Sequence, residues 1–370
     1  MKKLFLLTTA ALLLGAVACN KTNVPSSGTA VHSSPTGRVR LEIASSPQSK
    51  AAYNERKDFQ INSVQVFVFN SSDGKKETDR YEKLATPATS STSLTLNTLT
   101  GNKIIYAVVN SPRLNGVSSL TALEGTLSDL KENTISSLVM SGKSTLAVTE
   151  YDINKNSNAV AQTLEIKVKR LASLILLDQV KVNFNGTALE EGSFSIEEIY
   201  LKNVVGKCPL GVDDEGTPVL LSDTDHANTA YWYNKLTKTD GCPELTFDVF
   251  NLPCNTAGTA TQVSRFLLAY PNKTVDDTSS GSFSQRHTRL VIKAKVKASK
   301  YIDPDVDELT YYTFDLPVLK SNTVYKITNI NITMLGKKDD SNDDKTLVGV
   351  LNPTIKVEEW NEPVQIQYEM

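Results

Sequence analysis

The segment Ile61-Asn-Ser-Val-Gln-Val-Phe-Val-Phe69 contains the strongest β-strand signal in the first half of the chain. It is dominated by β-branched and aromatic residues, and Val64, Val66 and Val68 alternate with Phe67 and Phe69. Both faces of this strand are therefore apolar, as in a sheet that is covered on two sides. The segment predicts the core of a β-sandwich.

A second strand signal precedes this one, in Gly37-Arg-Val-Arg-Leu-Glu-Ile43. Apolar Val39, Leu41 and Ile43 alternate with charged residues, which is typical of a strand with one buried face. The polar residues 44–58 then lead to the strand at 61–69, and they include three basic residues, Lys50, Arg56 and Lys57. We expect this connecting segment to be open to a Lys- or Arg-specific protease.

Similar short strand signals, separated by Gly, Pro and Asn turns, recur along the chain. Within residues 118–140, leucines at helical spacing predict one short helix that Ser118 or Ser119 caps. The other expected strands are 93–97, 103–109, 146–148, 161–177, 171–184, 196–205, 245–252, 265–270, 289–296, 310–316 and 324–334. The pattern predicts an all-β protein, mainly strands with one short helix, built as a β-sandwich.

A length of 370 residues is typical of two domains. We place the boundary near Lys169-Arg170, which gives an N-terminal domain at 37–170, with a first strand at 37–50, and a C-terminal domain at 171–345. The long polar segments 207–245 and 271–287 are expected to be exposed loops.

The last residues, 346–370, read TLVGVLNPTIKVEEWNEPVQIQYEM. Two Pro-containing turn signals divide them into short strand-like runs. A strand at the end of a chain must pair within its own sheet or be donated to another molecule, because its edge and its apolar stripe are otherwise exposed. We interpret these runs as donor strands. Their contact residues would be Leu347, Val350, Ile355, Val357, Trp360, Val364, Ile366 and Tyr368.

The N-terminus carries an export signal. Lys2 and Lys3 precede an apolar run, and small residues lead directly to Cys19, which indicates a signal peptide over residues 1–18. Ala-Val-Ala before Cys19 resembles a bacterial lipobox, which implies cleavage before this residue and lipidation of its sulfur. Residues 19–36 are polar, lack periodicity and are expected to form a flexible tether.

Net charge and cysteine content narrow the class of protein further. The net charge is −2, and loss of Lys2 and Lys3 leaves 37 basic and 41 acidic residues, or −4, which does not favour a nucleic-acid partner. Three cysteines lie beyond Cys19, at Cys208, Cys242 and Cys254. We expect one disulfide among them in an exported protein. Their spacing leaves open which two pair.

No motif predicts catalysis, a cofactor or a metal. The three histidines, His32, His226 and His287, lie in polar segments, and neither GxSxG, HExxH nor a Gly-rich phosphate loop occurs. The acidic stretches 303–308 and 339–344 lack the spacing of an EF-hand and are read as solvated turns. Trp232, between two tyrosines, would either stack on a sugar or pack a loop onto the core.

Several of these features together resemble the fimbrillins of the Bacteroidetes, the major and minor fimbrial subunits. They are the lipobox, the strand with the basic segment before residue 61, Ile166-Lys-Val-Lys-Arg-Leu-Ala172, and the ending Val357-Glu-Glu-Trp360. The resemblance implies two transthyretin-like Greek-key β-sandwich domains followed by C-terminal donor strands. It also implies export as a lipoprotein to the outer membrane and proteolytic removal of the first strand, whose groove the next subunit's C-terminal strands then fill.

Transferred to this sequence, the family's cut maps to Lys50-Ala51, with Arg56-Lys57 as the second choice. The expected partners are other copies or homologous subunits, a Lys/Arg-specific protease, the outer membrane before maturation, and a host glycan or protein. The protein would be a non-enzymatic shaft subunit of an extracellular fimbrium that supports adhesion. The alternative is a lipid-anchored carbohydrate-binding protein, glycosidase or adhesin, including a tip or anchor subunit.

Overall fold

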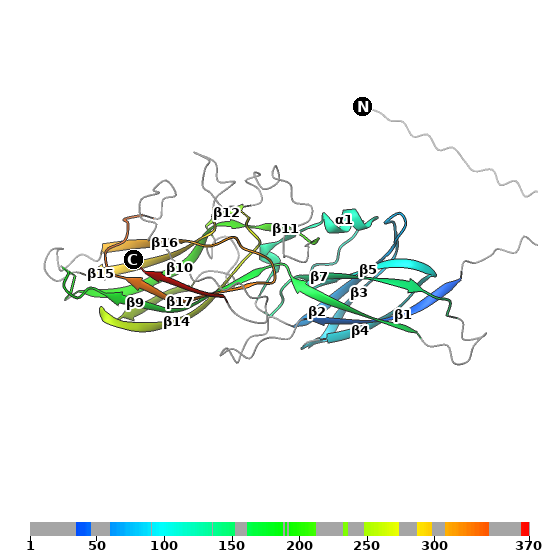
Figure 1. Ribbon diagram of the computed structural model, residues 1–370, viewed down its shortest axis with the longest axis horizontal. Coiled ribbons are helices and arrows are strands. Elements are labelled where there is room, and N and C mark those ends of the chain that lie inside the picture. Colours follow the sequence, from blue (N-terminus) through cyan, green and yellow to red (C-terminus); the bar gives the residue numbers. More distant parts are fainter. Residues whose placement is uncertain are drawn as a thin grey trace, which may run out of the picture. The chain divides into compact units, whose positions relative to one another are not determined.

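Strands make up most of the computed structural model of this protein (Figure 1). The structure describes residues 35–45, 60–89, 91–134, 136–151, 161–187, 189–190, 192–211, 232–235, 248–273, 287–297, 308–339 and 364–369. Within these ranges it contains one α-helix, of five residues. The all-β class with one short helix is thereby confirmed. The division into two Greek-key domains at residue 170 stays a prediction.

The first part of the fold is a seven-stranded sheet in the order β3-β2-β5-β7-β8-β1-β4. β7 and β8 pair at only two positions, and the two end strands β3 and β4 contact each other, so the sheet closes over one core. Its strands are β1 (Thr36–Ser45), β2 (Ile61–Asn70), β3 (Lys76–Ala88), β4 (Ser91–Leu99), β5 (Gly101–Val109), β7 (Met140–Val148) and β8 (Gln162–Arg170). The expected strands in this part are all present, and β3 is a strand that the sequence pattern did not predict.

The two apolar faces of β2 belong to two different cores. Val64, Val66 and Val68 pack inside the closed sheet with residues of β1, β4, β5 and β8. Phe67 and Phe69 lie on the opposite face, in a larger cluster that also includes buried residues of segment 111–139 and of the strands after residue 172. The alternation within residues 61–69 therefore reflects burial on both sides of one strand.

The expected helix is shorter than predicted. Only α1 (Leu120–Glu124) is helical, with Ser119 as its N-cap, whose side chain accepts a hydrogen bond from the Ala122 amide at 3.2 Å. A short strand β6 (Leu127–Asp129) and a 3-10 turn (Leu130–Glu132) follow it. Leu123 of α1 and Leu130 of the 3-10 turn are both fully buried in the large core cluster, so the helical spacing of the leucines does not correspond to one continuous helix.

The second part of the fold has two sheets, ordered β12-β10-β15-β16 and β14-β9-β17-β18, and β13 also pairs with β10. Buried side chains of both sheets belong to the larger core cluster. The strands are β9 (Ser173–Asn183), β10 (Ser193–Val205), β12 (Trp232–Lys235), β13 (Asp248–Cys254), β14 (Ala257–Ala269), β15 (Arg289–Lys297), β16 (Glu308–Asp315), β17 (Val324–Ile332) and β18 (Val364–Glu369).

The pairing pattern of the first part recurs in the second. β1 lies between antiparallel β4 and parallel β8, and β9 lies between antiparallel β14 and parallel β17. The strand that follows each of them also has matching partners, since β2 pairs with β3 and β5, while β10 pairs with β13 and β15. The two parts thus share this pattern of pairing, although the sequence shows no repeat of short period.

The junction between the two parts is short and buried. Leu171 and Ala172 alone separate β8 from β9, and both are almost fully buried. β6 pairs with β11 (Lys207–Pro209), and the Leu210 carbonyl accepts hydrogen bonds from the Tyr106 and Ser141 hydroxyls at 2.9 and 2.7 Å. Residues 208–211 are therefore buried in this junction, which corrects the expectation that segment 207–245 is an exposed loop from its start.

The expected disulfide does not form between the two described cysteines. Cys208 and Cys254 are both buried and free, and burial raises the pKa of both thiols, that of Cys254 to about 11. Both cysteines lie in the large core cluster, where they pack as small apolar side chains. Cys242 lies outside the described residues.

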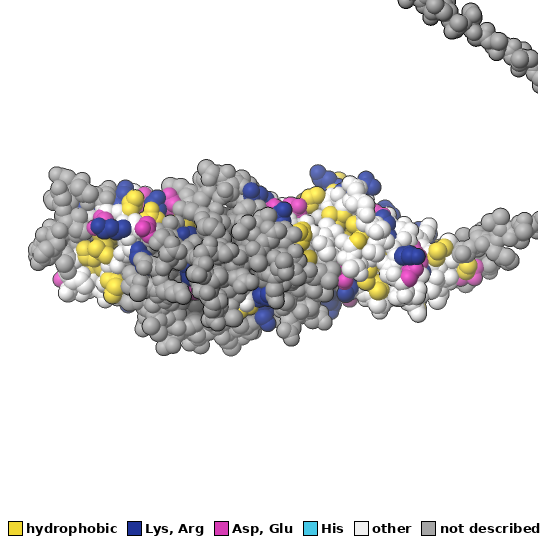
Figure 2. All heavy atoms as spheres, turned by 90° about the horizontal axis from the view of Figure 1, so that it is seen from above, with side chains coloured by type: hydrophobic (Ala, Val, Ile, Leu, Met, Phe, Trp, Pro, Cys, Tyr) yellow, Lys and Arg dark blue, Asp and Glu magenta, His cyan; other side chains and the backbone are white. Residues whose placement is uncertain are grey.

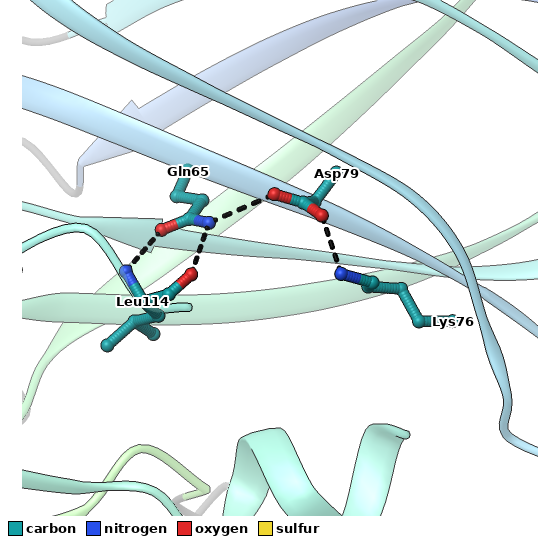
Figure 3. Close-up of polar contacts among 4 residues, drawn as sticks. All are labelled: Gln65, Lys76, Asp79 and Leu114. Carbon is teal, nitrogen blue, oxygen red and sulfur yellow. Dashed lines mark hydrogen bonds and ion pairs between the residues drawn. The ribbon is translucent and has the colours of Figure 1, made fainter. Parts of the chain in front are cut away.

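A polar tie fastens the segment before α1 to the outer face of β2 (Figure 3). The buried Gln65 amide accepts a hydrogen bond from the Leu114 amide at 2.8 Å and donates to the Leu114 carbonyl at 3.0 Å and to Asp79 at 3.2 Å. Lys76 donates to the other carboxylate oxygen of Asp79 at 2.7 Å. Burial alone would raise the pKa of Asp79, but these hydrogen bonds and the charges of Lys76 and Arg113 outweigh it and lower that pKa.

The Asp79 tie predicts a pH-dependent contribution to stability. A lowered native pKa stabilises the fold at neutral pH, and this contribution is lost as the pH falls through the native pKa of Asp79. We expect Asp79→Asn to lower the free energy of unfolding by about 1–3 kcal/mol at neutral pH, with a much smaller difference once wild-type Asp79 is protonated. Urea unfolding at neutral pH and at a pH below the native pKa of Asp79 measures this difference. The exposed Glu82→Gln serves as the control, and an equal loss at both pH values would contradict the assignment.

Candidate functional site

β1 occupies an interior position in its sheet. It pairs antiparallel with β4 from Thr36 opposite Leu99 to Ala44 opposite Ser91. On its other side it pairs in parallel with β8, from Val39 opposite Gln162 to Ser45 opposite Val168. An interior strand satisfies backbone donors and acceptors on both of its edges and contributes one face to the core. The first described strand of the chain, drawn in blue in Figure 1, is therefore part of the core structure.

Three side chains of β1 complete the core of the closed sheet. Val39, Leu41 and Ile43 are each 0 % exposed. On β4 they face Leu96, Leu94 and Thr92, and on β8 they face Gln162, Leu164 and Ile166. Full burial of aliphatic side chains contributes about 1.5–3 kcal/mol each. The predicted apolar stripe is thus confirmed as buried core.

The opposite face of β1 is exposed and weakly held. Arg38 lies 5.5 Å from the centroid of the Tyr151 ring, and the Arg40–Glu42 ion pair is 3.8 Å long with both side chains more than half exposed. At the start of the strand, the Tyr151 amide donates to the Thr36 carbonyl at 2.9 Å and the Thr100 amide donates to the Pro35 carbonyl at 3.1 Å. Because exposed pairs of this kind contribute about 0–1 kcal/mol, apolar burial and sheet pairing dominate the binding of β1.

Gly37 allows β1 to pass close to the end of β7. A Cβ atom at residue 37 would lie 2.2 Å from Val148 Cγ1 and 2.5 Å from the Thr149 carbonyl oxygen. Both distances are far below van der Waals contact, and one of the two atoms belongs to the backbone. Any larger residue at this position must therefore displace β1 or the end of β7.

Loss of β1 would open a slot between β4 and β8. The edges of both strands that now pair with β1 would become unpaired. The slot would expose apolar residues that β1 now covers, including Leu94, Leu96 and Ile166. In the part of the chain that the structure describes, the large exposed apolar side chains are Leu99, Leu309 and Met334. None of these three lines the slot, so while β1 is in place the slot is a buried apolar surface bordered by two strand edges.

The last described strand, β18, occupies an edge. It pairs in parallel with β17, from Val364 opposite Tyr325 to Glu369 opposite Asn331, and is drawn in red in Figure 1. Of the two arrangements that the sequence allows for a terminal strand, the isolated chain shows pairing within its own sheet. Donation to another molecule stays a prediction. Of the predicted contact residues only Val364, Ile366 and Tyr368 lie in β18, while Leu347, Val350, Ile355, Val357 and Trp360 lie outside the described residues.

Several other predicted positions also lie outside the described residues. They are the lipidation residue Cys19, both cut sites (Lys50-Ala51 and Arg56-Lys57), His32 and His226. His287 is described and is partly buried, with its backbone carbonyl accepting a hydrogen bond from the side-chain Nδ2 of Asn203 at 3.3 Å. The backbone of Trp232 pairs with Val205 of β10.

The described residues contain no cluster of three or more His, Cys, Asp or Glu side chains that could hold a metal ion. Their helical segments also include none with the length and apolar character of a membrane span. On the face drawn in Figure 2, basic and acidic side chains of the described residues are interspersed rather than gathered by sign.

The sequence pattern predicts the strand that fills the slot but not which two strands lie on either side of it. β4 and β8 were both expected as strands, yet nothing in their patterns says that β1 lies between them. The inward residues Leu94 and Leu96 alternate with polar residues in the same way as those of β1. Matching alternation identifies strands that share a core, whereas neighbours are set by tertiary pairing.

Comparisons with known proteins agree with this geometry. Residues 36–182, from the first residue of β1 to the penultimate residue of β9, match the family described as Major fimbrial subunit protein (FimA). The resemblance to fimbrillins is thus confirmed over this stretch. No protein of curated function matches the chain.

Solved structures show the same fold at low sequence identity. A fimbrilin (fimA) from Porphyromonas gingivalis W83 is 16% identical, with a TM-score of 0.53 over 89% of this chain and 97% of that one. A protein from Parabacteroides distasonis ATCC 8503, provisionally named a cell adhesion protein, is 19% identical, with a TM-score of 0.59 over 88% of this chain and 98% of that one.

The close approach at Gly37 predicts that Gly37→Ala loosens β1. We expect the unfolding free energy to fall by about 1–3 kcal/mol, as for other overpacked positions. The amides of residues 36–45 should also exchange hydrogen faster than in the wild type. Arg40→Ala on the exposed face of the same strand is the control and should change both quantities little. Wild-type exchange rates in Gly37→Ala would show that the contact with Val148 and Thr149 does not constrain β1.

Proposed function

Because residues 36–182 match the major fimbrial subunit family, we propose that this protein is a structural subunit of a cell-surface fimbria. It is exported as a lipoprotein through Cys19 and reaches the outer membrane. It loses residues up to the cut site, β1 included, and polymerises head to tail by strand exchange. The assembled fimbrium is extracellular and supports adhesion and colonisation. The subunit has no enzymatic role.

The main support for this proposal is the position of β1. β1 is an interior strand whose side chains complete a core, yet it is the first described strand of the chain. A cut between β1 and β2 would detach it without breaking any other described strand. The topologically equivalent β9 is different, because Leu171 and Ala172 join it directly to β8. Of these two equivalent strands, only β1 can leave the fold through a single cut.

Residues 46–59 provide the place for that cut. They separate β1 from β2 and contain Lys50, Arg56 and Lys57. Proteases act on segments that present their backbone in an extended, accessible form. A Lys/Arg-specific protease cutting at Lys50-Ala51, or at Arg56-Lys57, would separate β1 from the chain while leaving β2 whole.

The donated segment is residues 346–370. In its last run Val364, Ile366 and Tyr368 alternate with polar residues, as Val39, Leu41 and Ile43 do in β1. Within its own chain this run pairs with one described strand, at an edge. In the slot of a neighbour it would pair with both β4 and β8 and bury an apolar stripe, which favours transfer from the edge to the slot. Head-to-tail transfer uses two different surfaces and does not close, so a filament results.

Polymerisation after cleavage is the first test. Treatment of the full chain with a Lys- or Arg-specific protease should convert a monomer into a ladder of stable oligomers, because only the cut empties the slot. A chain lacking residues 346–370 should be cut equally but stay monomeric. Untreated protein is the control. If the cut wild type remains monomeric with an empty slot, strand exchange is wrong. Glycan binding by the deleted chain that requires Trp232 would instead support a carbohydrate-binding module.

The position of the cut is the second test. N-terminal sequencing of assembled protein should show a start at Ala51, or at Lys57 for the second site. Lys50→Gln should move the start from Ala51 to Lys57 without loss of assembly, since both cuts release β1. Lys75→Gln, in an exposed turn after β2, is a matched control. Assembled protein that still begins at lipidated Cys19 would contradict maturation by cleavage and point to an anchor subunit.

A further inference from the structure

β4 depends on β1 for its place in the sheet. Among the described strands β1 is its only ladder partner, because β4 ends the sheet order. β8, on the other side of β1, also pairs with β7. Departure of β1 would therefore leave β4 without any strand pairing, although β4 forms one wall of the slot. A slot that accepts a new strand needs another contact that holds β4.

A buried polar cluster supplies such a contact. Glu77 of β3 accepts a hydrogen bond from the Thr98 hydroxyl of β4 at 2.8 Å. Its other carboxylate oxygen pairs with the Lys103 ammonium of β5. The side chains of Lys103 and Glu77 are only 4% and 14% exposed. One carboxylate thus links β4 to two strands of the opposite layer, and the link is shielded from water.

A second contact holds the middle of β4. The Arg80 guanidinium of β3 donates to the Thr95 carbonyl of β4 at 2.7 Å and also to the Glu82 carboxylate at 3.2 Å. This contact is exposed, so it is weaker than the buried one. Both contacts join β4 to β3 or β5, and neither includes any residue of β1.

The buried cluster lies at a defined end of the slot. Thr98 is opposite Gly37 in the ladder, and Leu96 and Leu94 are opposite Val39 and Leu41. Thr98, Leu96 and Leu94 are all buried on β4, alternating with more exposed residues. The polar cluster therefore closes the apolar slot at its Gly37 end.

We propose that Glu77, Lys103 and Thr98, with the Arg80–Thr95 contact, act as a clamp that keeps β4 against β3 and β5 after β1 has left. The clamp keeps the slot in the shape that an incoming strand requires. These are positioning residues, since their side-chain hydrogen bonds described above join β3, β4 and β5 and none of these bonds includes β1. The inference rests on the proposed loss of β1.

The clamp would act by preorganising the slot. If β4 detached in the empty state, an incoming strand would bind only the small fraction of molecules whose slot is formed, and its apparent affinity would fall by that fraction. A buried hydrogen bond to a charged group is strong enough to change such a fraction by about tenfold or more. In the uncut chain the ladder with β1 also holds β4, so the clamp matters less there.

The test measures binding of a fluorescent peptide of residues 36–45 to a chain lacking residues 346–370, which is expected to stay monomeric, after cleavage between β1 and β2 and removal of the released fragment. Thr98→Val removes the hydroxyl donor and keeps the side-chain shape, and Glu77→Gln removes the charge. Both should weaken peptide binding by about tenfold or more. Asn97→Ala is the control on the same strand, because Asn97 is exposed and belongs to neither contact, and it should bind within about twofold of the wild type.

Two further measurements distinguish loss of the clamp from loss of the fold. Thermal unfolding of each uncut variant shows whether the fold survives, and Arg80→Ala tests the exposed contact if the buried variants do not fold. Wild-type affinity in Thr98→Val, Glu77→Gln and Arg80→Ala would overturn the clamp, as would the absence of peptide binding to the cut chain that lacks residues 346–370 and carries no substitution. Failure of the proposed function has a different signature. The peptide would then still bind in a clamp-dependent manner, whereas the cut full chain would form no oligomer ladder.

Discussion

Burial of one apolar stripe, formed by Val39, Leu41 and Ile43, is the constraint on which the first part of the fold depends. These side chains lie at 0 % exposure between β4 and β8 and complete a core that also includes the valines of β2. Apolar burial and two-sided sheet pairing hold β1, whereas its outer face adds only exposed polar contacts. The strand is thus both essential to the closed core and joined to the remaining sheet through a single connecting segment.

The recurring topology explains why this arrangement is asymmetric along the chain. β1 and β9 occupy the same place between an antiparallel and a parallel neighbour. β9 is continuous with the preceding strand through two buried residues, and the Leu210 carbonyl and the β6–β11 pairing further secure that junction. The second part therefore keeps its interior strand β9, whereas a protease could separate β1, the interior strand of the first part, from the rest of the chain.

Polar interactions are placed where the apolar core ends. The Glu77–Lys103–Thr98 cluster closes the slot beside Gly37, and the Gln65–Asp79–Lys76 tie fastens the segment before α1 to the other face of β2. Buried charged groups of this kind are costly unless their hydrogen bonds are satisfied. Their geometry consequently specifies the position of each strand or segment more sharply than apolar contact does. This difference is the basis for separating the role of β1, which fills the slot, from that of β3 and β5, which hold the wall of the slot.

The all-β class, most of the strands, the inward stripe of β1 and the double-sided burial of residues 61–69 could all be predicted from the sequence. These follow from local alternation, which records the face that each side chain presents. Alternation did not show that β1 lies between β4 and β8, that the leucines of 118–140 do not form one continuous helix, that Cys208 and Cys254 remain free, or that the pairing around β1 recurs around β9. Those features depend on which distant segments pair. A period of two residues is the same for every partner strand, so only the tertiary structure could decide among them.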